Sequence, residues 1–147
     1  MSTYKSLAGP AGGLIVTNDA EIAEKLDTIA FPGMTANFDA AKSAALALTM
    51  LDWRKHGKQY AKAMVRLSKR LAKEFAKVGL PIEAVDGDMN GLRIGTPELV
   101  RWGVQEKHAP RLASLIATAL RSNGPETLAD EVREFRQEFQ DIHYICE

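Results

Sequence analysis

The chain has 147 residues, of which 46% are apolar and 26% charged, with 19 lysines and arginines against 19 aspartates and glutamates. A chain of this size buries about 68–70% of the surface that its unfolded form exposes, so we expect one globular domain and not a disordered tail. Balanced charge does not favour nucleic acid as a partner, and the single cysteine, Cys146, excludes an intrachain disulfide and a cysteine-based metal site.

The first elements predicted along the chain are a short strand and a helix. Residues 13–17 are rich in aliphatic side chains and lie between glycine and Asn18-Asp19, which is typical of a strand. Asn18 followed by Glu21 predicts a helix N-cap with a capping-box partner, and the helix should end before Pro32-Gly33. The apolar residues of this helix recur at helical spacing: Ile22, Leu26 and Ile29.

Two further helices are predicted on either side of a break at His56-Gly57. The first begins near Asn37, and its many alanines would allow a neighbouring element to approach closely. The second begins after Gly57 and should end at Gly79, a natural C-terminal stop. Its apolar residues alternate in steps of four and three and form one stripe: Tyr60, Met64, Leu67, Leu71, Phe75 and Val78.

The C-terminal part of the chain predicts one more short strand and three helix starts. Residues 91–95 have the pattern of a strand, and Thr96-Pro97 predicts a helix entry with the hydroxyl at the N-cap. Helices follow at about 110–121 and 127–140. The last one carries a single apolar face: Leu128, Val132, Phe135, Phe139 and Ile142. The pattern as a whole is that of a helix-dominated α/β chain.

Lys5 is the first candidate for chemistry, because it precedes a turn that contains Gly9, Gly12 and Gly13. A lysine held rigidly near free backbone N–H groups can form a Schiff base with an aldehyde cofactor. The alternative is an ordinary solvated lysine. The pattern is not a nucleotide phosphate loop, since the lysine comes before the glycines and no Ser or Thr follows a Gly-Lys pair.

Arg93 is the second candidate, because it lies between Leu92 and Ile94 on the predicted strand 91–95. Side chains alternate along a strand, so the guanidinium should project away from its two apolar neighbours. Its planar fork suits a carboxylate bound through two parallel hydrogen bonds. The alternative is a structural ion pair with a nearby acid such as Asp86, Asp88 or Glu98.

Both stretches are similar to signature segments of the serine (glycine) hydroxymethyltransferases. Residues 2–13 resemble the segment that carries their pyridoxal-phosphate lysine, and residues 91–97 resemble the segment that carries their substrate-carboxylate arginine. Residues 30–33 resemble the loop that reaches across a dimer interface to the cofactor phosphate. The resemblance implies the C-terminal half of a fold-type I pyridoxal-phosphate enzyme, with 1–57 as the end of the cofactor domain and 58–147 as a small C-terminal domain.

The resemblance also implies roles for individual residues. Lys5 would hold pyridoxal 5'-phosphate, and Arg93 would anchor the carboxylate of a small β-hydroxy amino acid. Ser2 falls where the family places a hydroxyl near the cofactor. Backbone groups of Ala36 and Asn37 fall where the family lends N–H donors to the neighbouring subunit's phosphate. The implied chemistry is one-carbon transfer through tetrahydrofolate, or aldol cleavage.

Departures from the family pattern narrow the expected substrate and the expected use of tetrahydrofolate. Tyr4, expected beside the substrate, stands where histidine is usual, and Ala8 and Ala11 stand where arginines are common. These changes indicate a divergent branch that acts on α-methylserine or another β-hydroxy amino acid, and they argue against folate use. The interval from Lys5 to Arg93 is several tens of residues short, with the gap expected between residues 78 and 83.

A partner is expected as well. The family's acid for the pyridine nitrogen, its stacking aromatic, its main phosphate cradle and its catalytic glutamate all precede the lysine, in sequence that this chain does not contain. The resemblance therefore implies a homodimer or a complementary N-terminal chain. The alanine-rich helix near residues 40–47 is the expected interface.

The alternative to an enzyme is a non-catalytic helical binding module or remnant with weak nucleic-acid binding, because residues 58–77 carry seven lysines and arginines against Glu74. Such a face could track the phosphates of a nucleic acid. The pattern favours a solvated outer face instead, since the aromatic residues of this segment belong to the apolar stripe and none lies on the basic face to stack on bases. His56, His108 and His143 share no metal-ligand spacing, so no metal site is expected. Without a long apolar run or a leader pattern, a cytoplasmic protein is expected.

Overall fold

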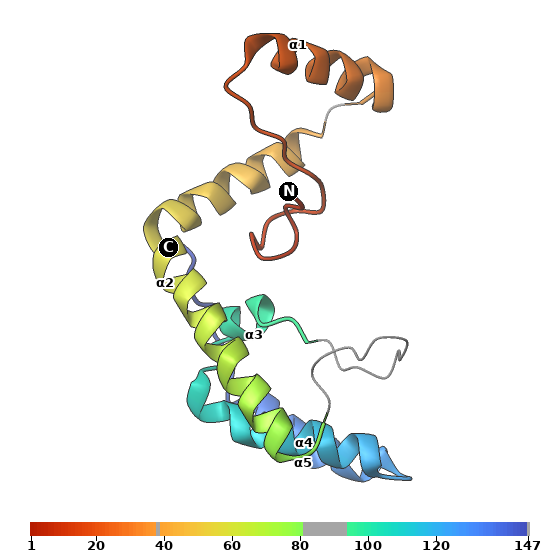
Figure 1. Ribbon diagram of the computed structural model, residues 1–147, viewed down its shortest axis with the longest axis vertical. Helices are drawn as coiled ribbons and strands as arrows, with labels where there is room; N and C mark the ends of the chain where they lie inside the picture. Colours follow the sequence, from red (N-terminus) through yellow and green to blue (C-terminus); the bar gives the residue numbers. More distant parts are fainter. Residues whose placement is uncertain (38, 81–93, 147) are drawn as a thin grey trace. The chain divides into compact units, whose positions relative to one another are not determined.

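The computed structural model describes residues 1–37, 39–80 and 94–146. Within these ranges the regular structure is helical, which confirms the predicted dominance of helices (Figure 1). The chain divides into two compact units, Met1–Lys55 and His56–Glu147, which are described separately below. The helices are α1 (Ala20–Thr28), the π-helical turn η1 (Ile29–Met34), α2 (Ala40–Lys77), α3 (Pro97–Arg101), the 3-10 turn η2 (Glu106–His108), α4 (Ala109–Arg121), the 3-10 turn η3 (Pro125–Leu128) and α5 (Ala129–Gln137).

Neither predicted strand is seen in the described ranges. Gly13 makes one isolated antiparallel bridge with Ser2, and residues 14–17 continue as irregular chain. An aliphatic run becomes a strand only when a neighbouring segment takes up its backbone hydrogen bonds, and the short Met1–Ser2 segment cannot do this beyond one bridge. Residues 91–93 of the second predicted strand lie outside the described residues, and Ile94 and Gly95 have no regular structure.

Helix α1 of the first unit begins one residue later than predicted. Its N-cap is Asp19 and not Asn18: Asp19 Oδ1 accepts hydrogen bonds from the backbone N–H groups of Glu21 at 2.9 Å and Ile22 at 3.1 Å. An aspartate at this position also interacts favourably with the positive end of the helix dipole. α1 buries no residue, and Ile22 is 48% exposed, so the described residues of this unit cover its apolar face only in part.

Helix α2 runs from Ala40 to Lys77 without the predicted break at His56-Gly57. A glycine inside a helix costs only about 1 kcal/mol relative to alanine, and Gly57 is buried, so this glycine alone does not end the helix. The helix begins after Asp39, whose Oδ1 accepts a hydrogen bond from Lys42 N–H at 3.0 Å.

The predicted apolar stripe of α2 forms the core of the second unit. Five of its six members are buried, and Tyr60 and Leu67 keep 2% and 1% of their surface exposed. The helix ends as predicted at Gly79, which adopts φ +69°. Gly79 N–H donates to Ala76 O and Leu80 N–H donates to Phe75 O, the hydrogen-bond pair of a Schellman motif.

The segment that begins at Thr96 closes over this stripe. Helix α3 begins at Pro97 as predicted, but the Thr96 hydroxyl does not cap it: the hydroxyl donates to Met64 O at 3.2 Å, and Tyr60 Oη donates to Pro97 O at 3.1 Å. Both bonds attach α3 to α2. Burial raises the pKa of Tyr60 above its usual 10.0, and the charge of Arg101, whose guanidinium lies 5.6 Å from the ring, opposes that rise.

Helices α4 and α5 complete the second unit, close to the predicted ranges. Ala109, Ala113 and Ala117 are buried along one face of α4, and Phe135 and Phe139 are buried at α5 and just beyond it. The two phenyl rings meet edge to face with centroids 5.1 Å apart. The other apolar residues of the predicted face are more exposed, since Val132 and Ile142 each keep 48% of their surface.

Candidate functional site

Residues 1–14 form a closed loop that carries Lys5. The loop is closed by a reciprocal pair of bonds, since the Met1 amino group donates to Leu14 O at 2.7 Å and Leu14 N–H donates to Met1 O at 2.9 Å. Inside this pair, two residues further along each arm of the loop, Thr3 N–H donates to Gly12 O at 3.1 Å. The turn that was predicted to be rigid from its glycines is therefore held by backbone pairing.

Thr3 lies inside this loop and keeps 2% of its surface exposed. Its hydroxyl donates to Pro10 O at 2.6 Å, and its carbonyl accepts from Gly9 N–H at 2.8 Å. Lys5 is exposed on the outside of the loop, and its carbonyl accepts from Ala8 N–H at 2.8 Å. The backbone of Lys5 thus lies between two residues that internal hydrogen bonds fix, while its side chain faces solvent.

The loop is attached to the N-terminal part of α2. Trp53 Nε1 donates to Leu7 O at 2.8 Å, across 46 residues of sequence. A side chain at Gly9 would place its Cβ 3.1 Å from Thr3 O and 3.2 Å from Thr49 Oγ1, so the backbone of the loop approaches the buried Thr49 closely. A Cβ at this point would require these neighbours to move by a few tenths of an ångström.

The other predicted site residues are distributed as follows. Ser2 is half-buried beside Gly13, and Tyr4 is 55% exposed on the same loop as Lys5. Ala36 and Asn37 are exposed after η1, and in the described part of the chain no hydrogen bond joins either of them to the Lys5 loop. Arg93 lies outside the described residues, so its position relative to Lys5 stays a prediction.

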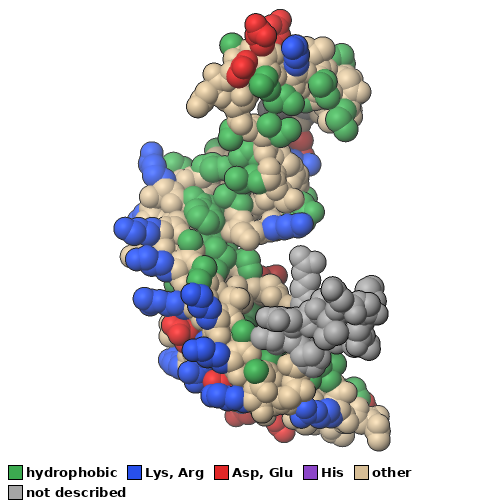
Figure 2. Space-filling model, viewed as in Figure 1, with side chains coloured by type: hydrophobic (Ala, Val, Ile, Leu, Met, Phe, Trp, Pro, Cys, Tyr) green, Lys and Arg blue, Asp and Glu red, His purple; other side chains and the backbone are tan. Residues whose placement is uncertain are grey.

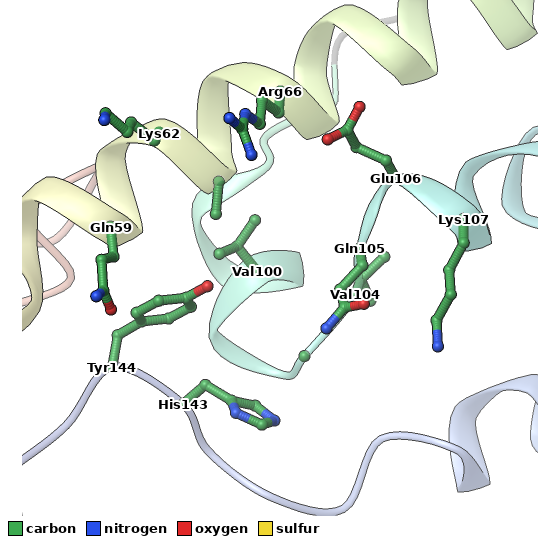
Figure 3. Close-up of a pocket in the computed structure, with 12 residues that line it drawn as sticks. Gln59, Lys62, Arg66, Val100, Val104, Gln105, Glu106, Lys107, His143 and Tyr144 are labelled. Carbon is green, nitrogen blue, oxygen red and sulfur yellow. The ribbon is translucent and has the colours of Figure 1, made fainter.

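The second unit contains a separate hollow of about 530 Å³ between α2, the α3–η2 segment and residues 143–144 (Figure 3). Its walls combine apolar side chains such as Val100 and Tyr144 with the polar Gln59 and Gln105. Lys62 and Lys107 also line it, but Figure 3 shows that they extend in different directions. These two lysines therefore do not converge on one point.

The basic face of α2 in the second unit is exposed, as Figure 2 shows for its lysine and arginine side chains. Glu74, its one acid, is buried at 6% exposure and pairs with Lys77 at 2.9 Å and Arg70 at 3.0 Å. The hydrogen bond from Lys77 lowers the pKa of Glu74, burial opposes this, and the charge of Arg70 adds to it. Part of the basic charge is thus compensated within the helix.

The described residues contain neither a cluster of metal ligands nor a membrane-spanning helix. No group of three or more His, Cys, Asp or Glu side chains lies close enough together to hold a metal ion there. Within the same residues, no helix combines the length and the apolar character that a membrane crossing requires.

The chain is similar to known enzymes over nearly its whole length. The chain is 45% identical to an α-methylserine aldolase of a Ralstonia species and 41% identical to one of Variovorax paradoxus, in each case over 99% of the chain and 43% of the relative. It is 29% identical to the serine hydroxymethyltransferase of Korarchaeum cryptofilum, over all of the chain and 45% of that enzyme. No protein-family model matches it.

These matches confirm the predicted resemblance. The chain is homologous to part of the serine hydroxymethyltransferases and, with higher identity, to part of the α-methylserine aldolases. It spans less than half the length of the curated relatives it matches. The alignment with the Ralstonia enzyme covers 190 positions although the chain has 147 residues, so the relative has at least 43 residues within the matched range that have no counterpart here. A gap of the expected size is therefore present in the matched range, and its location between Lys5 and Arg93, at residues 78–83, stays a prediction.

Proposed function

We propose that this chain takes part in pyridoxal-phosphate chemistry on a small β-hydroxy amino acid, with Lys5 as the amine to which the cofactor attaches. One observation carries the proposal: the lysine that resembles the family's cofactor lysine lies on a hydrogen-bonded, closed loop with its side chain exposed, in a chain 45% identical to an α-methylserine aldolase. An exposed amine on a fixed backbone suits attachment to an aldehyde, because little freedom is lost when the bond forms.

Each nearby residue has a proposed part. When bound, pyridoxal phosphate supplies an electron sink for a bond broken at the α-carbon. Lys5 would hold the cofactor and later exchange a proton through its amine, Ser2 would donate a hydroxyl hydrogen bond near it, and Tyr4 would contact the substrate. Arg93 would bind the substrate carboxylate through its planar fork. The backbone N–H groups of Ala36 and Asn37 would serve the cofactor phosphate of a neighbouring subunit.

α-Methylserine is the substrate that we favour over serine. Cleavage of its Cα–Cβ bond releases the hydroxymethyl carbon as formaldehyde, and protonation of the α-carbon gives alanine, so the atoms balance without a carrier. This direct cleavage does not require tetrahydrofolate, in agreement with the departures from the transferase pattern at Tyr4, Ala8 and Ala11. The relatives of Ralstonia and Variovorax paradoxus, at 45% and 41% identity against 29% for the serine hydroxymethyltransferase of Korarchaeum cryptofilum, carry the name α-methylserine aldolase.

The site is proposed to be completed by a second polypeptide. The first unit carries Lys5, but only Thr3 and Thr49 are buried among its described residues, while Phe31, Met34 and Leu48 are 59–80% exposed. Such apolar surface is typical of an interface. We propose a second copy of the chain or a chain equivalent to the N-terminal part of the relatives, with residues 1–57 as the end of a cofactor domain, 58–147 as a small domain and the cytoplasm as the location.

Reductive labelling tests the role of Lys5. The purified chain is incubated with pyridoxal phosphate and reduced with borohydride, and the adducts are located by peptide mass spectrometry. We expect selective labelling of Lys5, with Lys25 as the internal reference because it is also exposed and lies in the same unit. Lys5→Arg should abolish the adduct without a change in helix content, whereas Lys25→Arg should leave Lys5 labelling unchanged. Equal labelling of all surface lysines would refute the proposal.

Product analysis tests the substrate. The chain is mixed with a complementary N-terminal segment of the Ralstonia relative. Formaldehyde and alanine are measured with α-methylserine as substrate, and glycine is measured with serine as substrate. We expect formaldehyde and alanine from α-methylserine without tetrahydrofolate, and loss of both products in Lys5→Arg. Formation of glycine from serine only in the presence of tetrahydrofolate, with no cleavage of α-methylserine, would favour the transferase reaction instead.

A further inference from the structure

We propose that Thr3 and Trp53 are positioning residues that fix the Lys5 loop for attachment to an aldehyde. The inference rests on the proposed function of Lys5 and adds two residues that neither the glycine pattern nor the resemblance assigns. Thr3 would fix the loop from inside, and Trp53 would fix it to α2.

Thr3 is bound at three points. Its N–H donates to Gly12 O at 3.1 Å, its carbonyl accepts from Gly9 N–H at 2.8 Å, and its hydroxyl donates to Pro10 O at 2.6 Å. The first two bonds are made by the backbone and do not depend on the threonine side chain. The third depends on the hydroxyl, and its acceptor lies on the opposite side of the loop. Loss of the hydroxyl would leave the part-buried carbonyl of Pro10 without this donor.

Trp53 makes the contact that joins the loop to a helix. Its indole N–H donates to Leu7 O at 2.8 Å, and Leu7 lies two residues after Lys5. The close approach of Gly9 to Thr49, one helical turn before Trp53, brings a second point of the loop against α2. A phenylalanine at position 53 would keep the aromatic packing but would have no N–H to donate.

Lys5 lies between these attachments. Thr3 precedes it by two residues and Leu7 follows it by two, and its own carbonyl is bonded to Ala8 N–H at 2.8 Å. With both attachments present, the Lys5 backbone is held before the cofactor arrives. Without one of them, the loop must be ordered during attachment, and this cost lowers the rate. The loss of one neutral hydrogen bond corresponds to about a fivefold effect.

The test combines labelling with hydrogen exchange. Thr3→Val and Trp53→Phe each remove one donor at nearly constant shape, Thr3→Ser restores the hydroxyl, and Trp102→Phe is the matched control in the other unit. The first measurement is the ratio of Lys5 to Lys25 labelling by pyridoxal phosphate and borohydride. The second is amide exchange of residues 1–14 without cofactor, with far-UV circular dichroism to confirm that the helices persist.

We expect about a fivefold fall in the labelling ratio for Thr3→Val and for Trp53→Phe, faster exchange in residues 1–14, and recovery in Thr3→Ser. Unchanged ratios in both variants, beside selective labelling of Lys5 in the unaltered chain, would overturn the positioning roles and leave the proposed function intact. Absence of selective labelling in the unaltered chain would overturn the proposed function and the positioning roles with it. Faster exchange with an unchanged ratio would show a structural role only and would also overturn the inference.

Discussion

Leu67→Ala should be among the most damaging single changes in the second unit. Leu67 is at the centre of the α2 stripe and keeps 1% of its surface exposed. Removing its buried carbons loses about 0.8 kcal/mol for each methylene equivalent, and the cavity left behind adds to this, for a total of about 3–5 kcal/mol. Native domains have only about 5–15 kcal/mol of stability, so the change removes a large part of it.

Urea unfolding followed by circular dichroism measures this loss. With a slope of about 1–3 kcal/mol per molar urea, the midpoint should fall by at least about 1 M. Leu48→Ala is the matched control, because it is the same substitution on the same helix at a leucine that is 65% exposed. Its effect should stay within about 0.5 kcal/mol. Equal effects of the two substitutions would refute the assignment of the stripe as the core.

Three further predictions concern pH, a helix end and nucleic acid. Burial lowers the pKa of His108 below 6.5; the charge of Lys107 adds to this shift and that of Glu138 opposes it. The folded state therefore binds the proton less readily than the unfolded state, and stability should fall as pH drops from about 6.5 into the lowered range. Urea midpoints measured at several pH values should show this fall, and His108→Gln should flatten it. Gly79→Ala introduces a Cβ at φ +69° and should cost about 1–2 kcal/mol in the same assay, with Gly79→Asn costing less; equal costs would contradict the left-handed assignment. Short DNA and RNA should show no binding to the chain at low salt, and a steep salt-dependent affinity would restore the basic-helix alternative.

Local patterns predicted the second unit well. The four- and three-residue steps from Tyr60 to Phe75 predicted which side chains are buried, since a helix with one apolar stripe packs that face against the core. Gly79 predicted the helix end because a left-handed residue terminates the hydrogen-bond ladder. Both signals lie within a few residues of the feature they predict.

Features that depend on distant partners were predicted less well. Whether residues 13–17 form a strand depends on a neighbouring segment, and the described chain offers them only one bridge. The Thr96 hydroxyl was predicted to cap its own helix, but it reaches Met64 O on α2 instead, 32 residues away. In both of these cases the missing information is a tertiary partner. Gly57 was predicted to break α2, but a glycine costs only about 1 kcal/mol relative to alanine and the helix continues through it.

The candidate site shows the same division between local and distant information. Lys5 and the glycines after it were recognisable from sequence, but Trp53 could not be linked to them, because 46 residues separate its indole from Leu7 and no periodicity relates the two. That link also matters for stability. The first unit has 55 residues, and a domain below about 70–80 residues rarely obtains more than 3–5 kcal/mol even from a good core. Its described residues bury only two threonines. The order of the Lys5 loop must therefore come from polar contacts such as the Trp53 hydrogen bond and from contacts that cover the exposed apolar side chains of this unit.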